Sequence, residues 1–347
     1  MEAVAQLQGF QGEVGVTMDY EPLFLEACKK LLESSLDTRT TDMIPVEIST
    51  CDLPVIDLGR LNSTDHVERE ECKKEIIEAA KQWGFFQVVN HGISQQLLQR
   101  LLSEQMKVFH RPFAQKSQET STSFNYKWGN PFATNPRQLS WSEAFHVLPH
   151  GPPNMADHHH QCLRSMTEAF ARKAGPLAQR LAEILGEELN MKSRYFRENC
   201  LPNTSFIRLN RYPPCPIPKH VFGFLPHSDS TFLTILFQDQ VGGLQLLRDG
   251  TWVGVKPNPH SLLVNIGDLF QVLSNGVYRS IRHRVAAAQK VERFSVAYFY
   301  NPSHDAVIES HGTPKVYRSF TFREYKQQIE KDVKETGDKV GLFRFLL

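Results

Sequence analysis

Apolar residues recur at the spacing of amphipathic helices in several parts of the chain. Ile76 and Ala80 lie on one side of a charged segment that ends at Gly84, and Ser94 is a favoured N-cap before a stripe of leucines. Pro176 interrupts the longest such segment, where we expect it to kink the helix. The pattern predicts helices over residues 22–36, 68–83, 94–109, 161–189 and 322–336.

Short apolar and β-branched runs bounded by Pro, Gly and Asn or Asp predict strands. These runs cover residues 53–58, 85–89, 232–237, 244–247, 252–255, 261–266 and 294–300. Asp249-Gly250 stands between two of them and is a strong signal for a tight hairpin. Residues 117–160 are rich in Ser, Asn, Pro and Gly, so we expect a loop with short strands there. Helices followed by many short strands predict an α+β fold with a β-sandwich or barrel at its centre.

The charge balance narrows the choice of partners. Of the 347 residues, 39 are Lys or Arg and 38 are Asp or Glu, which gives a formal net charge of +1. Nucleic acids and anionic membranes select strongly basic surfaces, so neither is expected as a partner. We expect a small-molecule partner instead, and the sequence says nothing about oligomeric state.

The cysteines and the N-terminus indicate the compartment. The 6 cysteines contain no CxxC pair, so neither a disulfide framework nor a cysteine zinc site is expected. The N-terminus has no basic and apolar signal pattern, and no apolar run is long enough for a membrane span. We therefore expect a reducing compartment, the cytoplasm with the nucleus also open, and no secretion.

The strongest chemical signal is the sequence His227-Ser228-Asp229. Because alternate residues of a strand share a face, His227 and Asp229 can reach one metal ion. His283 follows an apolar run and is the best candidate for a third ligand. Two histidines and one carboxylate form the facial triad of non-haem Fe(II) oxygenases, which leaves coordination positions open for a co-substrate and O₂. A His-x-Asp pair alone is a weak motif that surface loops also contain.

Two further pairs accompany this triad. Arg293 and Ser295 alternate on one face, and an arginine fork beside a hydroxyl suits a carboxylate. Asn210 and Tyr212 share a face upstream, where Pro213 ends the strand. Taken alone, Arg293 is more often an ion-pair residue, and the alternative for Tyr212 is core packing.

In this order and spacing, Asn-x-Tyr, His-x-Asp, His and Arg-x-Ser resemble the plant 2-oxoglutarate- and Fe(II)-dependent dioxygenases. The resemblance extends to residues 53–57 and 83–92 and covers nearly all of the chain. It implies an α+β fold with a double-stranded β-helix (jelly-roll) core and flanking α-helices. It also implies an enzyme that couples oxidative decarboxylation of 2-oxoglutarate to hydroxylation of an unactivated C–H bond.

The same resemblance implies the roles of individual residues. The implied iron ligands are His227, Asp229 and His283. The implied 2-oxoglutarate site contains Arg293, which we also count as catalytic, with Ser295, Tyr212 and Asn210. The implied cofactors are Fe(II), 2-oxoglutarate as co-substrate, O₂, and ascorbate as reductant.

The resemblance also divides the chain into segments. We expect an N-terminal arm and helix in residues 1–50, an N-terminal dioxygenase region in 51–160, a long helical segment in 161–200, the jelly-roll core in 201–310, and a C-terminal helix and tail in 311–347.

Other segments bear on the substrate. Residues 126–131, 139–146 and 332–346 are similar to segments of gibberellin 2-oxidases, particularly the branch that acts on C20 gibberellins. This similarity implies hydroxylation of a gibberellin at C-2 on the β face, which inactivates the hormone. The candidate substrate-binding residues are Tyr126, Trp128, Trp141 and Phe145. For the two tryptophans, core packing is the alternative.

Two other functions remain open on the sequence. One is a related dioxygenase that acts on a flavonoid, coumarin or alkaloid, and the other is a non-catalytic jelly-roll protein that binds a small acid. The intact triad and Arg293 count against the second. Lys127 or Arg137 could meet a substrate carboxylate, although such cations are mostly solvated surface residues.

Overall fold

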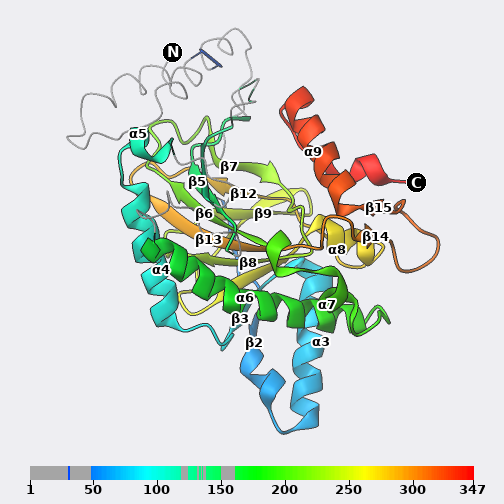
Figure 1. The fold of residues 1–347 in the computed structure, drawn as a ribbon. Helices are drawn as coiled ribbons and strands as arrows, with labels where there is room; N and C mark the ends of the chain where they lie inside the picture. Colours follow the sequence, from blue (N-terminus) through cyan, green and yellow to red (C-terminus); the bar gives the residue numbers. More distant parts are fainter. Residues whose placement is uncertain are drawn as a thin grey trace.

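A computed structural model describes most of the chain (Figure 1). The described residues are 30–31, 48–118, 124–130, 133, 135, 138–149 and 161–347. Of the expected helix over residues 22–36, the structure describes only residues 30–31. The candidate cation Arg137 lies outside the described residues.

Most helices lie in the first part of the chain, and most strands follow them. The helices are α3 (His66–Trp83), α4 (Gln95–Phe109), α5 (Phe113–Lys116), α6 (Gln161–Glu187), α7 (Tyr195–Asn199), α8 (Asp268–Leu273) and α9 (Phe322–Thr336), with 3-10 turns η1 (Leu58–Asn62), η4 (Pro202–Thr204) and η5 (Gly341–Phe345). The strands are β1 (Thr50–Cys51), β2 (Val55–Asp57), β3 (Phe85–Val89), β4 (Phe124–Trp128), β5 (Glu143–Val147), β6 (Phe206–Tyr212), β7 (Phe222–His227), β8 (Leu233–Gln238), β9 (Leu244–Arg248), β10 (Thr251–Val255), β11 (Leu262–Ile266), β12 (His283–Ala286), β13 (Arg293–Tyr300), β14 (Val307–Ile308) and β15 (Phe320–Thr321).

Two sheets form the centre of the molecule. The larger has the strand order β2-β3-β11-β8-β13-β6-β5-β4, and the smaller has the order β1-β10-β9-β12-β7. Helices α3, α4 and α6 cover the outer face of the larger sheet (Figure 1). The main apolar core fills the space between this face and the helices, and it includes the fully buried Phe109, Phe170 and Phe270. The expected α+β fold with a β core and flanking helices is confirmed.

Several element ends follow from local chemistry, as predicted. Ser94 accepts a hydrogen bond from the Leu97 amide and so caps α4. Gly84 ends α3 at φ 62°, where an added Cβ would lie 2.4 Å from the Arg279 carbonyl oxygen, so only glycine fits. Asp249 and Gly250 take φ values of 48° and 77° in the hairpin between β9 and β10.

Other elements escaped the sequence pattern. The pattern did not mark β7, which contains Gly223 and Pro226, or β12, which has only four residues. Glycine and proline weaken a strand signal because they pack poorly or lack the amide donor. The sheet neighbours supply the missing stability, and both strands carry residues of the site described below.

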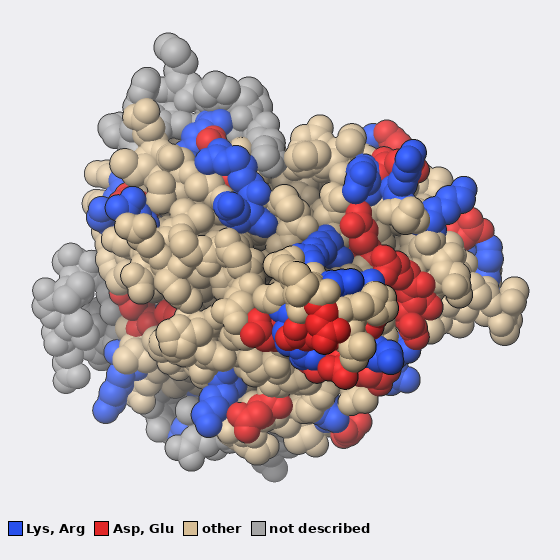
Figure 2. All heavy atoms as spheres, turned by 90° about the horizontal axis from the view of Figure 1, so that it is seen from below, with Lys and Arg blue, Asp and Glu red and all other residues tan. Residues whose placement is uncertain are grey.

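The described surface carries mixed charge. Where charged side chains gather on the face seen in Figure 2, acidic and basic ones lie next to one another. Ion pairs such as Lys73 with Glu187 and Lys81 with Glu188 join α3 to the end of α6 and the residue after it. Within the part of the chain that the structure describes, no helix is both long enough and apolar enough to cross a membrane.

Candidate metal centre and co-substrate pocket

A cavity opens between the two sheets. One wall comes from β6, β8 and β13 of the larger sheet, and the other comes from β7, β9 and β12 of the smaller sheet. Apolar side chains such as Phe85, Leu236 and Leu244 line much of it, and a few polar groups converge inside it. This combination is typical of a small-molecule site.

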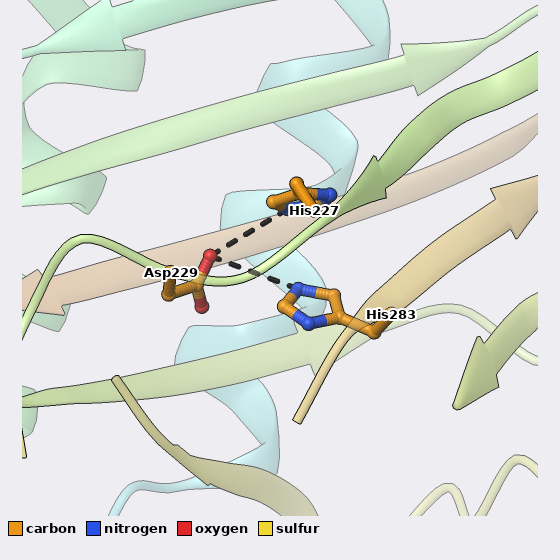
Figure 3. A group of neighbouring side chains, drawn as sticks. All are labelled: His227, Asp229 and His283. Carbon is orange, nitrogen blue, oxygen red and sulfur yellow. Dashed lines mark ion pairs between the residues drawn. The ribbon is translucent and has the colours of Figure 1, made fainter. Parts of the chain in front are cut away.

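His227, Asp229 and His283 converge in this cavity. Asp229 Oδ1 lies 3.6 Å from His227 Nε2 and 3.7 Å from His283 Nε2, as drawn in Figure 3. One ligand atom from each residue lies within 4.8 Å of the others, so a single metal ion can be shared by all three. Antiparallel pairing of β7 with β12 sets His227 directly opposite His283.

Backbone carbonyls orient both imidazoles. His227 Nδ1 lies 2.7 Å from the Leu225 carbonyl oxygen, and His283 Nδ1 lies 3.0 Å from the Ile281 carbonyl oxygen. A carbonyl only accepts hydrogen bonds, so each Nδ1 carries the proton and each Nε2 keeps its lone pair. This is the arrangement by which proteins prepare histidine for a metal.

Asp229 is held in its charged form. Its Oδ2 accepts hydrogen bonds from Thr234 Oγ1 at 2.7 Å and Asn265 Nδ2 at 2.8 Å, which leaves Oδ1 facing the histidines. Burial alone would raise the pKa of Asp229, but His283, His227 and Thr234 outweigh it and hold the pKa well below its ordinary value.

His283 is held in its neutral form. Burial, followed by the repulsion that a second protonated imidazole at His227 would exert, lowers the pKa of His283 to about 4. A neutral imidazole and an ionised carboxylate are the protonation states that a divalent metal requires of its ligands. The donor set therefore fits Fe(II).

The sequence reasoning about Asp229 was wrong in one detail. Strand β7 ends at His227, and Asp229 lies in the loop after it, so strand alternation does not bring the two residues together. Tertiary contacts fix this loop. The Asp268 amide donates to the Asp229 carbonyl at 2.7 Å, and Lys339 Nζ reaches the Ser228 carbonyl, also at 2.7 Å. The C-terminal tail thus braces the loop that carries the carboxylate.

A buried arginine stands at one end of the cavity. The side chain of Arg293 is nearly inaccessible, and Nη2 donates to Gln238 Oε1 at 2.7 Å. Its Nε and Nη1 are buried without a hydrogen-bond partner among the described residues. Buried donors rarely stay unpaired, so these two nitrogens indicate a charged acceptor that the chain itself does not supply, such as a carboxylate. The site therefore fits the distal carboxylate of 2-oxoglutarate.

The pairing of β6 with β13 brings further polar side chains to the Arg293 end of the cavity. Tyr212 lies opposite Arg293, and Asn210 lies opposite Ser295. The Arg293 guanidinium lies 4.9 Å from the centre of the Tyr212 ring, and Asn210 Nδ2 lies 3.4 Å from Ser295 Oγ. All four residues line the cavity, on the face that the sequence pattern assigned to them.

The four candidate substrate residues lie elsewhere. Phe145 is fully buried in the main core, and the Tyr126 hydroxyl donates to Glu143 Oε2 at 2.5 Å. Trp128 and Trp141 meet edge to face in a separate apolar cluster, and Trp141 Nε1 donates to the Pro214 carbonyl. None of the four lines the described cavity. Their role in substrate binding stays a prediction that this packing does not favour.

Lys127 and Arg137 are the two candidate cations for a substrate carboxylate. Lys127 is exposed on β4, whereas Arg137 lies outside the described residues. The sequence analysis missed Gln238, Thr234 and Asn265, because their contacts depend on strand register. It also missed Arg208, although Arg208 alternates with Asn210 and Tyr212 and so should share their face.

Two family models match the chain. Residues 203–302 match the 2OG-Fe(II) oxygenase superfamily, and residues 53–168 match the model described as non-haem dioxygenase in morphine synthesis N-terminal.

Related proteins agree with these matches. Gibberellin 2-beta-dioxygenase 8 of Arabidopsis thaliana is 50% identical over 94% of this chain and 98% of its own. Gibberellin 2-beta-dioxygenase 6 of Oryza sativa subsp. japonica is 44% identical over 85% of each chain. A crystal structure of JOX2 in complex with 2OG, Fe and JA has a TM-score of 0.74 and 30% identity, and the match covers 91% of this chain and 97% of that one. The double-stranded β-helix fold is thereby confirmed.

Proposed function

This chain belongs to the 2OG-Fe(II) oxygenase superfamily, and we propose that it hydroxylates a gibberellin at C-2 on the β face. It is a 2-oxoglutarate-dependent dioxygenase that uses Fe(II), 2-oxoglutarate and O₂, with ascorbate as reductant. The observation that carries the substrate assignment is the 50% identity to gibberellin 2-beta-dioxygenase 8 over 94% of the chain. Hydroxylation at this position inactivates the hormone.

We propose His227, Asp229 and His283 as the iron ligands. The geometry supports this because Nε2, Oδ1 and Nε2 face one another while every other polar atom of the three side chains is engaged. Fe(II) with 2-oxoglutarate supplies the oxidising chemistry when bound, and the protein supplies position and exclusion of water.

We propose Arg293 and Ser295 as the anchors of the distal carboxylate of 2-oxoglutarate, with Tyr212 and Asn210 beside them. The unpaired Nε and Nη1 of Arg293 support this assignment. Gln238 holds the third nitrogen of the guanidinium, so the guanidinium keeps one orientation. Gln105 of α4 donates to the carbonyl oxygens of Asn210 and Ser295 at 2.9 and 3.0 Å, and this fixes the two strands relative to each other.

The preference for C20 precursors is a finer part of the proposal. It rests on the similarity of residues 126–131 and 139–146 to the C20 branch of the gibberellin 2-oxidases. The compartment is also proposed, as the cytoplasm with the nucleus open. The free thiols of Cys51, Cys72 and Cys200 agree with a reducing compartment.

A substrate panel tests the function. The purified full-length chain with Fe(II), 2-oxoglutarate and ascorbate is given C19 and C20 gibberellins, a flavonoid and a coumarin, and products are identified by mass spectrometry. We expect one added oxygen atom at C-2 on the β face, with faster turnover of C20 precursors. Substrate-dependent succinate release with the flavonoid or coumarin, and with no gibberellin, would contradict the proposal and leave the dioxygenase class intact.

A further inference from the structure

The cavity contains a second arginine, and the proposed chemistry gives it no role. Arg208 lies on β6, on the same face as Asn210 and Tyr212, and lines the cavity together with the three proposed iron ligands. It stands four residues before Tyr212, which corresponds to about 13 Å along an extended strand. Arg208 and Arg293 therefore mark opposite ends of one polar row.

Contacts within the chain hold Arg208 without neutralising it. Nε donates to Asn210 Oδ1 at 2.8 Å, and the guanidinium carbon lies 4.7 Å from the centre of the Phe224 ring. Among the described residues, Arg208 has no carboxylate within ion-pair distance. Burial lowers the pKa of Arg208, and Tyr212 and Asp229 only partly oppose this shift. An arginine nevertheless stays charged, so the cavity holds a cation to which the described part of the chain supplies no directly paired carboxylate.

The surroundings of Arg208 are apolar and aromatic. Ala297 lies opposite Arg208 on β13, and its small side chain leaves space beside the guanidinium. The next rung pairs Phe206 with Phe299, whose rings stack at 4.6 Å. A cation beside aromatic walls suits a ligand that is mostly hydrocarbon and carries one negative group.

Phe224 connects this end of the cavity to the metal centre. Its ring centre lies 4.6 Å from that of His227 and 4.7 Å from the Arg208 guanidinium. The guanidinium is therefore no farther from the His227 ring than the sum of these two distances. A ligand whose carboxylate meets Arg208 has its hydrocarbon body within reach of the metal.

We propose that Arg208 binds a carboxylate of the substrate and thereby selects an apolar polycyclic acid and its orientation. The proposal rests on the proposed function, since a gibberellin is a rigid, mostly apolar acid. It assigns the two arginines of the cavity to two different acids, with Arg293 for the co-substrate and Arg208 for the substrate.

The test compares an acid with its ester. The gibberellin that wild-type protein turns over fastest, and its fully methylated ester, are assayed with wild type, Arg208→Met and Arg208→Lys. We expect Arg208→Met to raise the KM for the acid by about 10- to 100-fold, because a charge-assisted hydrogen bond is lost. The KM for the ester should not change between wild type and Arg208→Met, and Arg208→Lys should recover part of the affinity for the acid.

Two readouts separate this role from a structural one. The KM for 2-oxoglutarate and the visible absorbance of the anaerobic Fe(II)–2-oxoglutarate complex should match wild type in Arg208→Met. The matched control is Arg284→Met, which removes a different guanidinium, one that is buried and stacks on Trp252 outside the cavity. We expect that variant to keep the wild-type preference for acid over ester.

The outcomes are distinguishable. An unchanged KM for the acid in Arg208→Met, or a rise in the KM for 2-oxoglutarate instead, would overturn the assignment of Arg208 alone. Wild-type protein that turns over neither the acid nor the ester of any gibberellin would overturn the proposed function and the substrate named here.

Discussion

The charged side chains on the two faces of strand β6 differ in whether an opposite charge is paired with them. On the outer face, Arg211 Nη1 lies 2.7 Å from Glu143 Oε1, and Arg211 Nε lies 2.9 Å from Glu292 Oε2. Lys116 Nζ approaches the other oxygen of Glu143 at 2.6 Å, and the Tyr126 hydroxyl also donates to it. Every charge in this outer cluster, formed by Arg211, Glu143, Glu292 and Lys116, has an opposite charge beside it.

On the inner face, the described residues place no carboxylate within ion-pair distance of the arginine. Arg208 is three residues from Arg211, yet it faces the cavity, and its partners among the described residues are an amide oxygen and an aromatic ring. Burial alone would lower the pKa of Arg211, but Glu143 and Glu292 outweigh it and raise the pKa, whereas the pKa of Arg208 is lowered. Asp229, across the cavity, is likewise surrounded by neutral donors and histidines.

The difference separates structural charge from functional charge. A buried ion pair that is complete within the chain needs no ligand, and removal of one partner costs stability. A buried charge that the chain leaves without a counter-ion is costly unless a metal or ligand completes it. The two faces should therefore respond to substitution in different measurements, activity on the inner face and stability on the outer face.

The largest effect is expected for Asp229→Ala. We expect succinate release to fall by more than about 100-fold, the upper range for loss of a residue that only supports a metal ligand. The melting temperature should stay close to that of wild type, because the strands that carry the histidines remain. Enzyme assay, iron content and thermal melting check this, and activity retained at saturating Fe(II) would contradict the ligand assignment.

A smaller effect is expected for Arg293→Leu. The variant should raise the KM for 2-oxoglutarate by about 10- to 100-fold, since each charge-assisted hydrogen bond contributes about 1.5–3 kcal/mol. Arg293→Lys should recover only part of it, because an ammonium lacks the planar fork. Co-substrate titrations measure both variants, and an unchanged KM in Arg293→Leu would mean that another cation holds the carboxylate.

Substitutions in the outer cluster should change the stability of the protein and leave its activity near that of wild type. Glu143→Gln leaves Lys116 buried without its full counter-charge, so we expect a loss of about 3–5 kcal/mol in the free energy of unfolding. The kcat measured well below the melting temperature should stay near that of wild type. Glu292→Gln is the matched control, because Glu292 is more exposed and its loss should cost less than about 1 kcal/mol. Equal losses in the two variants would remove the distinction between the inner and outer faces.

Local signals were sufficient for much of this molecule. Ser94 and Gly84 mark helix ends through hydrogen bonding and backbone conformation within a few residues of themselves. Alternation along one strand correctly placed Arg293 with Ser295 and Asn210 with Tyr212. Residue type also restricted the chemistry, because two imidazoles, a carboxylate and an arginine fork suit few purposes other than a metal with an acid beside it.

Strand register and long-range packing decided the rest. Gln238 reaches Arg293 because β8 pairs with β13, and Asp229 meets the histidines because a loop is held by Asp268 and the distant Lys339. The aromatic residues Trp128 and Trp141 gave no such information, since an aromatic side chain fits a core as well as a pocket.

The sequence by itself therefore determined the secondary structure near clear caps and turns, the inner face of β6 and β13, and the kinds of group available for catalysis. Only the tertiary structure decided which of those groups meet, which charges are neutralised, and that Arg208 stands at the far end of the row from Arg293. The physical reason is the separation along the chain of the residues that each interaction joins. Caps and alternation depend on neighbours along the chain, whereas neutralisation of a buried charge depends on partners that only the packing of two sheets brings together.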